Sequence, residues 1–299
     1  MLARETRPVR LCRSWLFVDG ADDAIIAAAT RSGADVLIQE LEDFTPPPLR
    51  PKARDLAPEL YRKWRECGAV AAVRVNPLDA DGMDDLASVM RGRPDVVALP
   101  KVAEPAHVAA LDAAVGRFER EYGIPEGSTR LLPNIEFARG LVQIDGIAKV
   151  SRRTRAVLVA AEDMAADLGA ERAPDSVELA YVRQRFLVEC VAAGVLAVDC
   201  PYTWSDAEGV ARDTRWARRL GYRAKSLVAP AHAAIVNDLL TPAVADVANA
   251  ERLVAAFDAA RERGEARVEV DGALVEVPGY FMAKRLLARA AEFREWEQR

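Results

Sequence analysis

The sequence predicts an α/β protein whose main body is a closed (β/α)8 barrel, a TIM barrel, followed by a C-terminal helix–hairpin–helix extension. Short apolar runs of strand length alternate with segments of helical periodicity, which is the pattern of parallel strands joined by crossover helices. Eight such runs precede residue 230, and eight strand–helix units match a closed barrel better than an open sheet. We therefore expect a barrel over residues 10–240 and an extension over 241–299 that covers the barrel mouth or reaches a neighbouring subunit.

The expected strands are short apolar runs that end at turn residues or at polar side chains. In chain order they cover residues 15–18, 35–41, 71–75, 95–99, 131–135, 156–161, 196–200 and 224–228. Residues with apolar positions at helical spacing lie between them, at 22–32, 53–67, 106–122, 177–193 and 207–220, with a shorter helix introduced by Gly82. Residues 45–51 contain four prolines, so we expect a loop there.

The last part of the chain has a different pattern. Residues 245–263 and 280–298 have helical character, and residues 267–277 form a predicted hairpin that turns at Asp271-Gly272. This arrangement predicts the helix–hairpin–helix extension.

Composition excludes several classes of protein. The chain has 299 residues, of which 51% are hydrophobic and 29% charged, and its net charge of −5 gives no reason to expect nucleic acid or a membrane surface as a partner. No run approaches the roughly 18 apolar residues of a membrane span. The four cysteines show no CxxC spacing and are interpreted as reduced core residues. We therefore expect a cytoplasmic protein with a small-molecule ligand.

Two acids mark the expected site. Glu136 follows one predicted strand and Asp163 follows the next, so both acids fall at the carboxyl edge of the barrel, where such folds place their chemistry. Two carboxylates with little histidine nearby favour Mg²⁺ over zinc. Asp163 could instead cap a helix, and Glu162 is expected to face away from the site.

Basic residues at strand ends supply further candidates. Arg74 can hold a carboxylate or carbonyl oxygen through two parallel hydrogen bonds, or it can form a structural ion pair with Glu42 or Asp43. Lys101 and Lys225 lie near other strand ends and could contact an anionic group or form a Schiff base. The chain has only two histidines and no recognisable nucleophile motif, which makes a hydrolase triad improbable.

Several collinear motifs resemble the citrate lyase β-subunit-like family, which includes malyl-CoA and citramalyl-CoA lyases and belongs with the HpcH/HpaI-type aldolases. The motifs are Ser14-Trp15-Leu16-Phe17-Val18, Leu41-Glu42-Asp43, Arg74-Val75-Asn76-Pro77, Leu99-Pro100-Lys101, Ile135-Glu136 with Ala138-Arg139-Gly140, Ala161-Glu162-Asp163-Met164-Ala165, and Pro201-Tyr202.

The resemblance implies a TIM barrel, assembled as a homotrimer or a hexamer, that binds Mg²⁺ through Glu136 and Asp163. It implies that Arg74 binds the substrate, and the matching motifs add Lys101, Pro201 and Tyr202 as substrate-binding residues. Glu42 and Asp43 become catalytic candidates. In the C-terminal hairpin, Glu276 matches an acid that acts in a neighbouring subunit's site.

The resemblance further implies cleavage of a β-hydroxyacyl-CoA to acetyl-CoA and a 2-oxo acid. The chain departs from the family at residues 19–22, where a proline and an arginine are replaced, and at Ala229, where the family has histidine. Both departures fall where coenzyme A is expected to bind. An aldolase for a free 2-oxo or hydroxy acid, a malyl-CoA thioesterase and a non-catalytic assembly subunit therefore remain alternatives.

Overall fold

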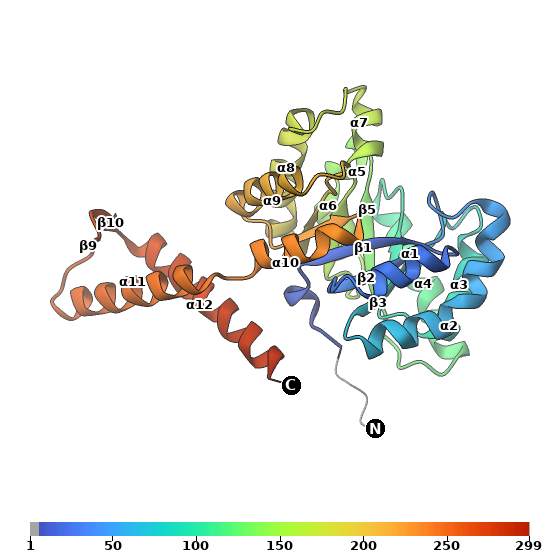
Figure 1. Cartoon of the computed structure of the whole chain (residues 1–299), viewed down its shortest axis with the longest axis horizontal. Coiled ribbons are helices and arrows are strands. Elements are labelled where there is room, and N and C mark those ends of the chain that lie inside the picture. The colour runs from blue at the N-terminus through green and yellow to red at the C-terminus, as the bar shows by residue number, and fades with distance from the viewer. Residues whose placement is uncertain (1–5, 299) are drawn as a thin grey trace. The chain divides into compact units, whose positions relative to one another are not determined.

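The chain divides into two compact units, the first ending at Leu240 and the second beginning at Thr241, in a computed structural model that describes residues 6–298. The first unit is a closed barrel of eight parallel strands in sequence order (Figure 1), which confirms the predicted TIM barrel. The strands are β1 (Ser14–Asp19), β2 (Val36–Glu40), β3 (Val70–Arg74), β4 (Val96–Leu99), β5 (Arg130–Ile135), β6 (Ala156–Val159), β7 (Leu196–Asp199) and β8 (Ala224–Leu227).

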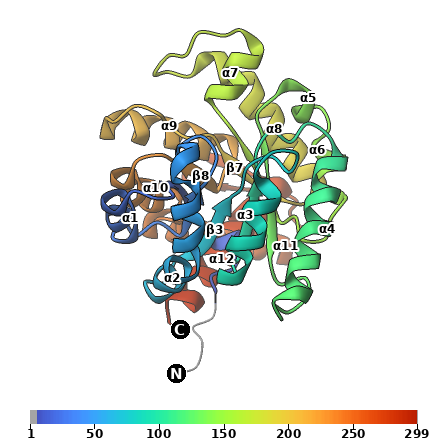
Figure 2. The ribbon, with the colours of Figure 1, turned by 90° about the vertical axis from the view of Figure 1, so that its right-hand side faces the viewer.

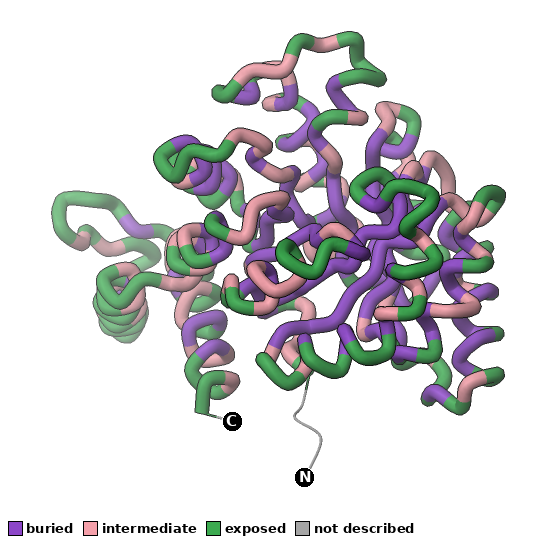
Figure 3. The backbone as a smooth tube through the Cα atoms, turned by 45° about the vertical axis from the view of Figure 1, so that its right-hand side comes forward, coloured by how far each residue is buried: buried purple, intermediate pink, exposed green. Residues whose placement is uncertain are grey.

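Alternating side chains along each strand build two separate apolar clusters. One lies inside the barrel and includes Trp15, Val36 and Leu132. The other includes Leu16 and Leu131 together with residues of the surrounding helices, so it fills the space between strands and helices. The barrel strands are buried along most of their length, and only Asp19, Arg130 and Leu196 at strand ends are half-buried (Figure 3). This period-two alternation fixes which strand residues face the barrel interior.

The helices of the first unit surround the strands (Figure 2). They are α1 (Asp23–Thr30), α2 (Arg50–Glu66), α3 (Gly82–Val89), α4 (Pro105–Glu121), α5 (Ala138–Leu141), α6 (Ile144–Lys149), α7 (Glu162–Leu168), α8 (Ala180–Ala193), α9 (Ala207–Leu220) and α10 (Ala233–Leu240). The loop predicted at 45–51 is partly wrong. A 3₁₀ turn covers Pro47–Leu49 and α2 already begins at Arg50, because proline is tolerated in the first turn of a helix.

The second unit has the predicted helix–hairpin–helix order. Helix α11 (Val244–Glu262) leads into the antiparallel strands β9 (Val268–Val270) and β10 (Ala273–Val275), and α12 (Val277–Glu297) follows. Phe257 of α11 stacks on Tyr280 of α12 with ring centroids 4.8 Å apart, and the Tyr280 hydroxyl donates to Asp258. These contacts join the two helices.

The cysteines are all free thiols. Three of them are buried as expected, but Cys67 is exposed because it follows the last turn of α2 at the surface. Among residues 6–298, the helices are each too short or too polar to cross a membrane.

A buried ion network joins strands β7 and β8 to helices α8 and α9. Arg183 Nη1 lies 2.7 Å from Asp213 Oδ1, and Lys225 Nζ lies 2.8 Å from Asp199 Oδ2 and 2.6 Å from Asp213 Oδ2. Lys225 alternates with the inward-facing Ala224 and therefore faces the helices. It is occupied by structural ion pairs, away from the barrel interior where a Schiff base with substrate would form.

Replacement of Asp213 by asparagine is expected to lower the free energy of unfolding by about 3–5 kcal/mol at pH 7, because it leaves two buried cations undercompensated. Although burial opposes ionisation, Lys225 and Arg183 hold the pKa of Asp213 well below its usual range. This stabilisation is therefore present above about pH 4, the usual unfolded value, and is lost as the pH falls further.

Urea denaturation at pH 7 and pH 3 measures the effect. The difference between wild type and Asp213→Asn should shrink at the lower pH. Replacing Glu59 by glutamine is the control, because Glu59 pairs with Arg62 on the surface and its loss should change nothing measurable. Equal stability of Asp213→Asn and wild type at pH 7 would contradict the structural role of the network.

Candidate active site at the carboxyl ends of the strands

Arg74 is the last residue of β3, and a neighbouring acid on β2 holds it in place. Glu40 pairs with Arg74 in the parallel register of these strands, and Arg74 Nε donates to Glu40 Oε1 at 2.8 Å. The Glu40 carboxylate also accepts from the backbone N–H groups of Glu42 and Phe44, at 2.8 and 2.5 Å. Glu40 therefore fixes both the arginine and the loop that follows β2.

The remaining nitrogens of Arg74 face the other acids. Nη2 lies 3.4 Å from Glu42 Oε2 and 3.6 Å from Asp43 Oδ2, and Nη1 lies 3.7 Å from Glu136 Oε1. The guanidinium also stacks over the ring of Phe17, 4.9 Å from its centroid. Burial alone would lower the pKa of Arg74, but the surrounding carboxylates raise it above its ordinary value, so the side chain stays charged.

Glu136 and Asp163 occupy the predicted positions after β5 and β6. Glu136 is 1% exposed, and its Oε1 has no hydrogen-bond partner among the described residues. Burial, together with the negative charges of Glu42 and Asp163, raises the pKa of Glu136 to about 8, although Arg74 opposes this shift. Asp163 lies within the first turn of α7, whose N-cap is Ala161, so Asp163 is not the N-cap of this helix.

The surroundings of Glu136 and Asp163 fit a magnesium ion. A buried carboxylate oxygen without a partner, crowded by other acids, is an arrangement that a divalent cation completes electrostatically. No group of three or more His, Cys, Asp or Glu side chains within residues 6–298 is arranged to hold a metal. Mg²⁺ needs no such group, since it is commonly bound by one or two carboxylates and completes its coordination with water and substrate.

Lys101 and Glu42 form a second pair at this rim. Lys101 has a left-handed backbone conformation, with φ of 55°, and its Nζ donates to Glu42 Oε1 at 2.6 Å. Glu42 Oε2 is buried without a hydrogen-bond partner in the described structure. Burial raises the pKa of the Glu42 carboxyl, although Arg74 and Lys101 oppose the shift. Glu42 therefore holds a proton more readily than an ordinary glutamate does.

The other predicted site residues make fewer contacts with the group formed by Arg74, Glu42 and Glu136. Asp43 is half exposed beside Arg74. Pro201 is partly exposed after β7, and Tyr202 is buried, with its hydroxyl donating to Asp206 at 2.6 Å. Glu276 is exposed at the start of α12 in the second unit. The substrate-binding roles of Pro201 and Tyr202 and the catalytic role of Glu276 stay predictions.

Glu40 was missing from the residues predicted for the site. The signal was present in the sequence, because Glu40 shares strand parity with the inward-facing Val36 and Ile38. We expect Glu40→Gln to lower the free energy of unfolding by about 2–4 kcal/mol, since an amide cannot accept from all three donors and Arg74 loses its nearest negative charge. Urea denaturation measures this change, and an unaltered midpoint would show that Glu40 does not hold the site together.

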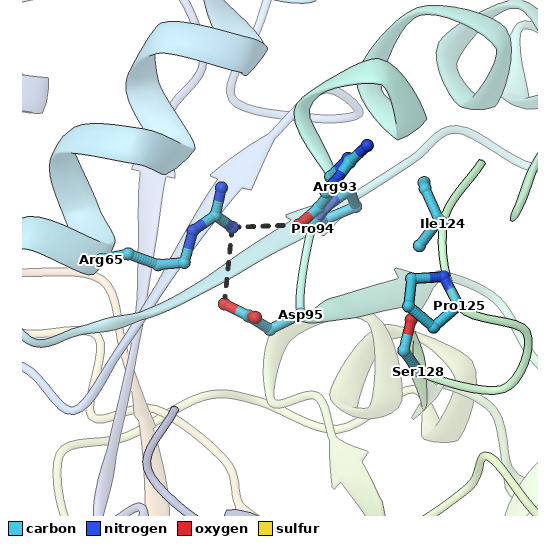
Figure 4. A pocket seen from close by; sticks show the side chains of 7 residues that line it. All are labelled: Arg65, Arg93, Pro94, Asp95, Ile124, Pro125 and Ser128. Atoms are coloured by element: carbon cyan, nitrogen blue, oxygen red, sulfur yellow. Dashed lines mark hydrogen bonds and ion pairs between the residues drawn. The ribbon is translucent and has the colours of Figure 1, made fainter. Parts of the chain in front are cut away.

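A small pocket lies at the opposite end of the barrel, where the strands begin. Its volume is about 260 Å³, and it is lined by Arg65, Arg93, Pro94, Asp95, Ile124, Pro125 and Ser128 (Figure 4). Arg65 Nη1 donates to the carbonyl of Arg93 at 3.0 Å and lies 3.8 Å from Asp95 Oδ2. None of the predicted site residues lines it, and barrel enzymes place catalysis at the other end, so the acid-rich rim is the better candidate.

Comparisons with known proteins agree with this assignment. Residues 13–230 match the family described as HpcH/HpaI aldolase/citrate lyase. The chain is 32% identical to the citrate lyase subunit beta of Leuconostoc mesenteroides subsp. cremoris, over 94% of both chains. It is 29% identical to two proteins of Cereibacter sphaeroides, a (3S)-malyl-CoA thioesterase over 97% of both chains and an L-malyl-CoA/beta-methylmalyl-CoA lyase over 95% of this chain and 96% of the lyase.

A solved structure is similar over nearly the full length. The CitE protein of Mycobacterium tuberculosis in complex with magnesium, acetoacetate and coenzyme A is 26% identical, with a TM-score of 0.73. The match covers 95% of this chain and 100% of that one.

Proposed function

We propose, since the chain belongs to the HpcH/HpaI aldolase/citrate lyase family, that it is a Mg²⁺-dependent enzyme that cleaves a β-hydroxyacyl-CoA of the malyl, citramalyl or citryl type to acetyl-CoA and a 2-oxo acid. The family and the lyase class expected from the sequence are confirmed by the relatives. One observation carries the proposal. At one end of the barrel, Glu136 lies close to the Arg74 guanidinium and is influenced by the negative charge of Asp163.

The reaction breaks the bond between the acyl carbon next to the thioester carbonyl and the carbon that bears the hydroxyl. The hydroxyl proton leaves to a base, its oxygen becomes the carbonyl of the 2-oxo acid, and the bonding electron pair passes to the thioester enolate. A proton delivered to the enolate carbon then gives acetyl-CoA. A magnesium ion held by Glu136 and Asp163 would act as a Lewis acid on the hydroxyl or carbonyl oxygen.

Arg74 binds and orients the small acid. Because Glu40 holds Nε, the two Nη groups are directed to the side where Glu42 and Glu136 lie. A guanidinium fixed in this way can donate to a developing oxyanion without reorganising during the reaction. Phe17 supports the flat face of the guanidinium, which limits its motion further.

Glu42 is the first candidate for proton transfer within the barrel. The raised pKa of Glu42, and a buried Oε2 that has no hydrogen-bond partner among the described residues, suit a group that accepts and returns a proton. Lys101, bonded to the other oxygen, orients the carboxyl. Asp43 and Glu276 are further candidates. We also propose a homotrimer or hexamer, in which Glu276 would serve a neighbouring subunit's site.

Two alternatives have specific support. The identity to a malyl-CoA thioesterase favours hydrolysis of the thioester as a second candidate. The segment at residues 19–22 favours an aldolase for a free acid, because it carries acids where the family resemblance implies an arginine. Asp19 and Asp22 accept hydrogen bonds from nearby backbone N–H groups. In either case Glu136, Asp163 and Arg74 keep their proposed roles.

A product assay by mass spectrometry separates these reactions. Purified protein with Mg²⁺ is incubated with malyl-CoA, citramalyl-CoA and citryl-CoA, and in parallel with the corresponding free acids. The proposal predicts acetyl-CoA together with glyoxylate, pyruvate or oxaloacetate. Free coenzyme A with malate would establish the thioesterase, turnover of the free acids alone would establish the aldolase, and no turnover of any compound would contradict the proposed function.

A further inference from the structure

One polar side chain inside the barrel has no assigned role. Asn134 lies on β5, two residues before Glu136, and is fully buried. Leu132 belongs to the cluster inside the barrel, whereas Leu131 and Ile135 belong to the cluster between strands and helices. Since side chains alternate along a strand, Asn134 faces the barrel interior on the same side as Leu132 and Glu136.

Neither Oδ1 nor Nδ2 of Asn134 has a hydrogen-bond partner among residues 6–298. In the adjoining strands, Asn134 is in register with Leu158, and Ala98 is in register with Leu132. Both Leu158 and Ala98 are apolar residues of the interior cluster. An amide in such surroundings loses its hydrogen bonds to water and gains none in return, so a buried polar group without a partner calls for a specific explanation.

The other inward-facing polar residues near this end of the barrel are partnered. Glu40 and Arg74 bond to each other, and Ser226 Oγ donates to the carbonyl of Asp199. Asn134 differs from them and resembles Glu136, whose Oε1 is likewise buried without a partner. Residues two apart on one face of a strand lie roughly 7 Å from each other. Asn134 therefore forms the layer of side chains directly beneath the proposed metal ligand.

We propose that the carboxamide of Asn134 forms the floor of the substrate site and binds an oxygen-bearing substituent on the deepest end of the small acid. The inference rests on the proposed function, because it takes Glu136 to be part of the substrate site. Nδ2 donates to a carbonyl or carboxylate oxygen, and Oδ1 accepts from a hydroxyl. The ligand class is a short 2-oxo or 2-hydroxy acid with a second oxygen group, in preference to one that ends in a methyl group.

A site built to hydrogen-bond a substrate oxygen discriminates strongly against an analogue that lacks it, since binding the analogue leaves the amide unpaired. Oxaloacetate and pyruvate differ in this way, because pyruvate has a methyl group where oxaloacetate has a CH₂ that bears a second carboxylate. We expect the wild type with Mg²⁺ to bind oxaloacetate at least about tenfold more tightly than pyruvate.

The test is calorimetric titration of the full chain with each acid in the presence of Mg²⁺, for wild type and for Asn134→Leu, which is similar in size but has no polar atoms. The variant should lose at least about tenfold in affinity for oxaloacetate and less than about threefold for pyruvate. Its melting temperature without ligand should rise by about 2 °C or more, because an unpaired buried amide has been removed. Asn134→Ala serves if the leucine variant does not fold.

Asn76→Leu is the matched control. Asn76 is also buried, but its Nδ2 donates to the carbonyl of Leu41 and to Asp85, so its loss should lower the melting temperature and leave the ratio of the two affinities unchanged. The proposal is overturned if Asn134→Leu leaves the ratio of the oxaloacetate and pyruvate affinities unaltered, which is the result expected if Asn134 held only a structural water. It is also overturned if the wild type binds neither acid. Selective binding by a wild type that cleaves none of the thioesters would overturn the proposed lyase reaction and leave the role of Asn134 standing.

Discussion

Replacement of Asp163 by alanine is expected to lower kcat for Mg²⁺-dependent carbon–carbon cleavage by at least about a thousandfold, while the protein remains folded. Glu136→Ala should have the same effect. Glu136 Oε1 has no hydrogen-bond partner within residues 6–298, and the N-cap of α7 is Ala161 and not Asp163, so we expect the fold to survive either substitution. Steady-state rates at increasing Mg²⁺ concentration, with thermal melting by circular dichroism, measure both properties.

Glu162→Ala is the matched control for this prediction. Glu162 adjoins Asp163 in the chain and in helix α7, but its side chain is exposed and pairs with Arg172 at 3.2 Å. Its removal should change the rate by less than about twofold. An Asp163→Ala protein that is active and still responds to Mg²⁺ would remove Asp163 from the metal site.

The second large effect is expected at Arg74. Arg74→Lys keeps the positive charge but cannot bond to Glu40 and also present two nitrogens to the substrate, so we expect kcat to fall by at least about a hundredfold. Arg74→Met also removes the charge and leaves Glu40 and Glu42 undercompensated. Because these carboxylates are buried, the free energy of unfolding should fall by about 3–5 kcal/mol. Rates and urea denaturation curves distinguish the two variants.

Arg54→Lys is the control for Arg74→Lys. Arg54 Nε lies 2.7 Å from the buried carboxylate of Asp85, so it is paired much as Arg74 is, but the structure places no predicted site residue in this pair. The substitution should lower stability and leave kcat unchanged. Full activity of Arg74→Lys would show that the arginine acts only as a structural counter-ion.

Most of the fold was predictable because each barrel strand is buried on both faces. Runs such as residues 71–73 and 156–159 are therefore apolar and short, and the predicted strand ends fall within two residues of the observed ones. Helix α10 and the division of residues 138–149 into α5 and α6 were not predicted. These helices are short, and packing against the barrel decides their limits.

The acids of the site were predictable from their position directly after strands, but their partners were not. An ion pair of Arg74 with Glu42 or Asp43 was predicted as the alternative to substrate binding. Both acids lie near Arg74, at 3.4 and 3.6 Å, but its shortest contact, at 2.8 Å, is to Glu40. That contact depends on the register between β2 and β3, which only the folded barrel defines. The unpaired state of Asn134 likewise emerges from the apolar residues on the neighbouring strands.

The most direct test of the account is the metal dependence of carbon–carbon cleavage by the wild-type protein. The best substrate from the thioester panel would be incubated with protein treated with EDTA and shown by elemental analysis to be metal-free. Mg²⁺ would then be added back. We predict no detectable acetyl-CoA or 2-oxo acid before the addition and restored formation of both afterwards. Undiminished cleavage by the metal-free protein would contradict the proposed role of Glu136 and Asp163.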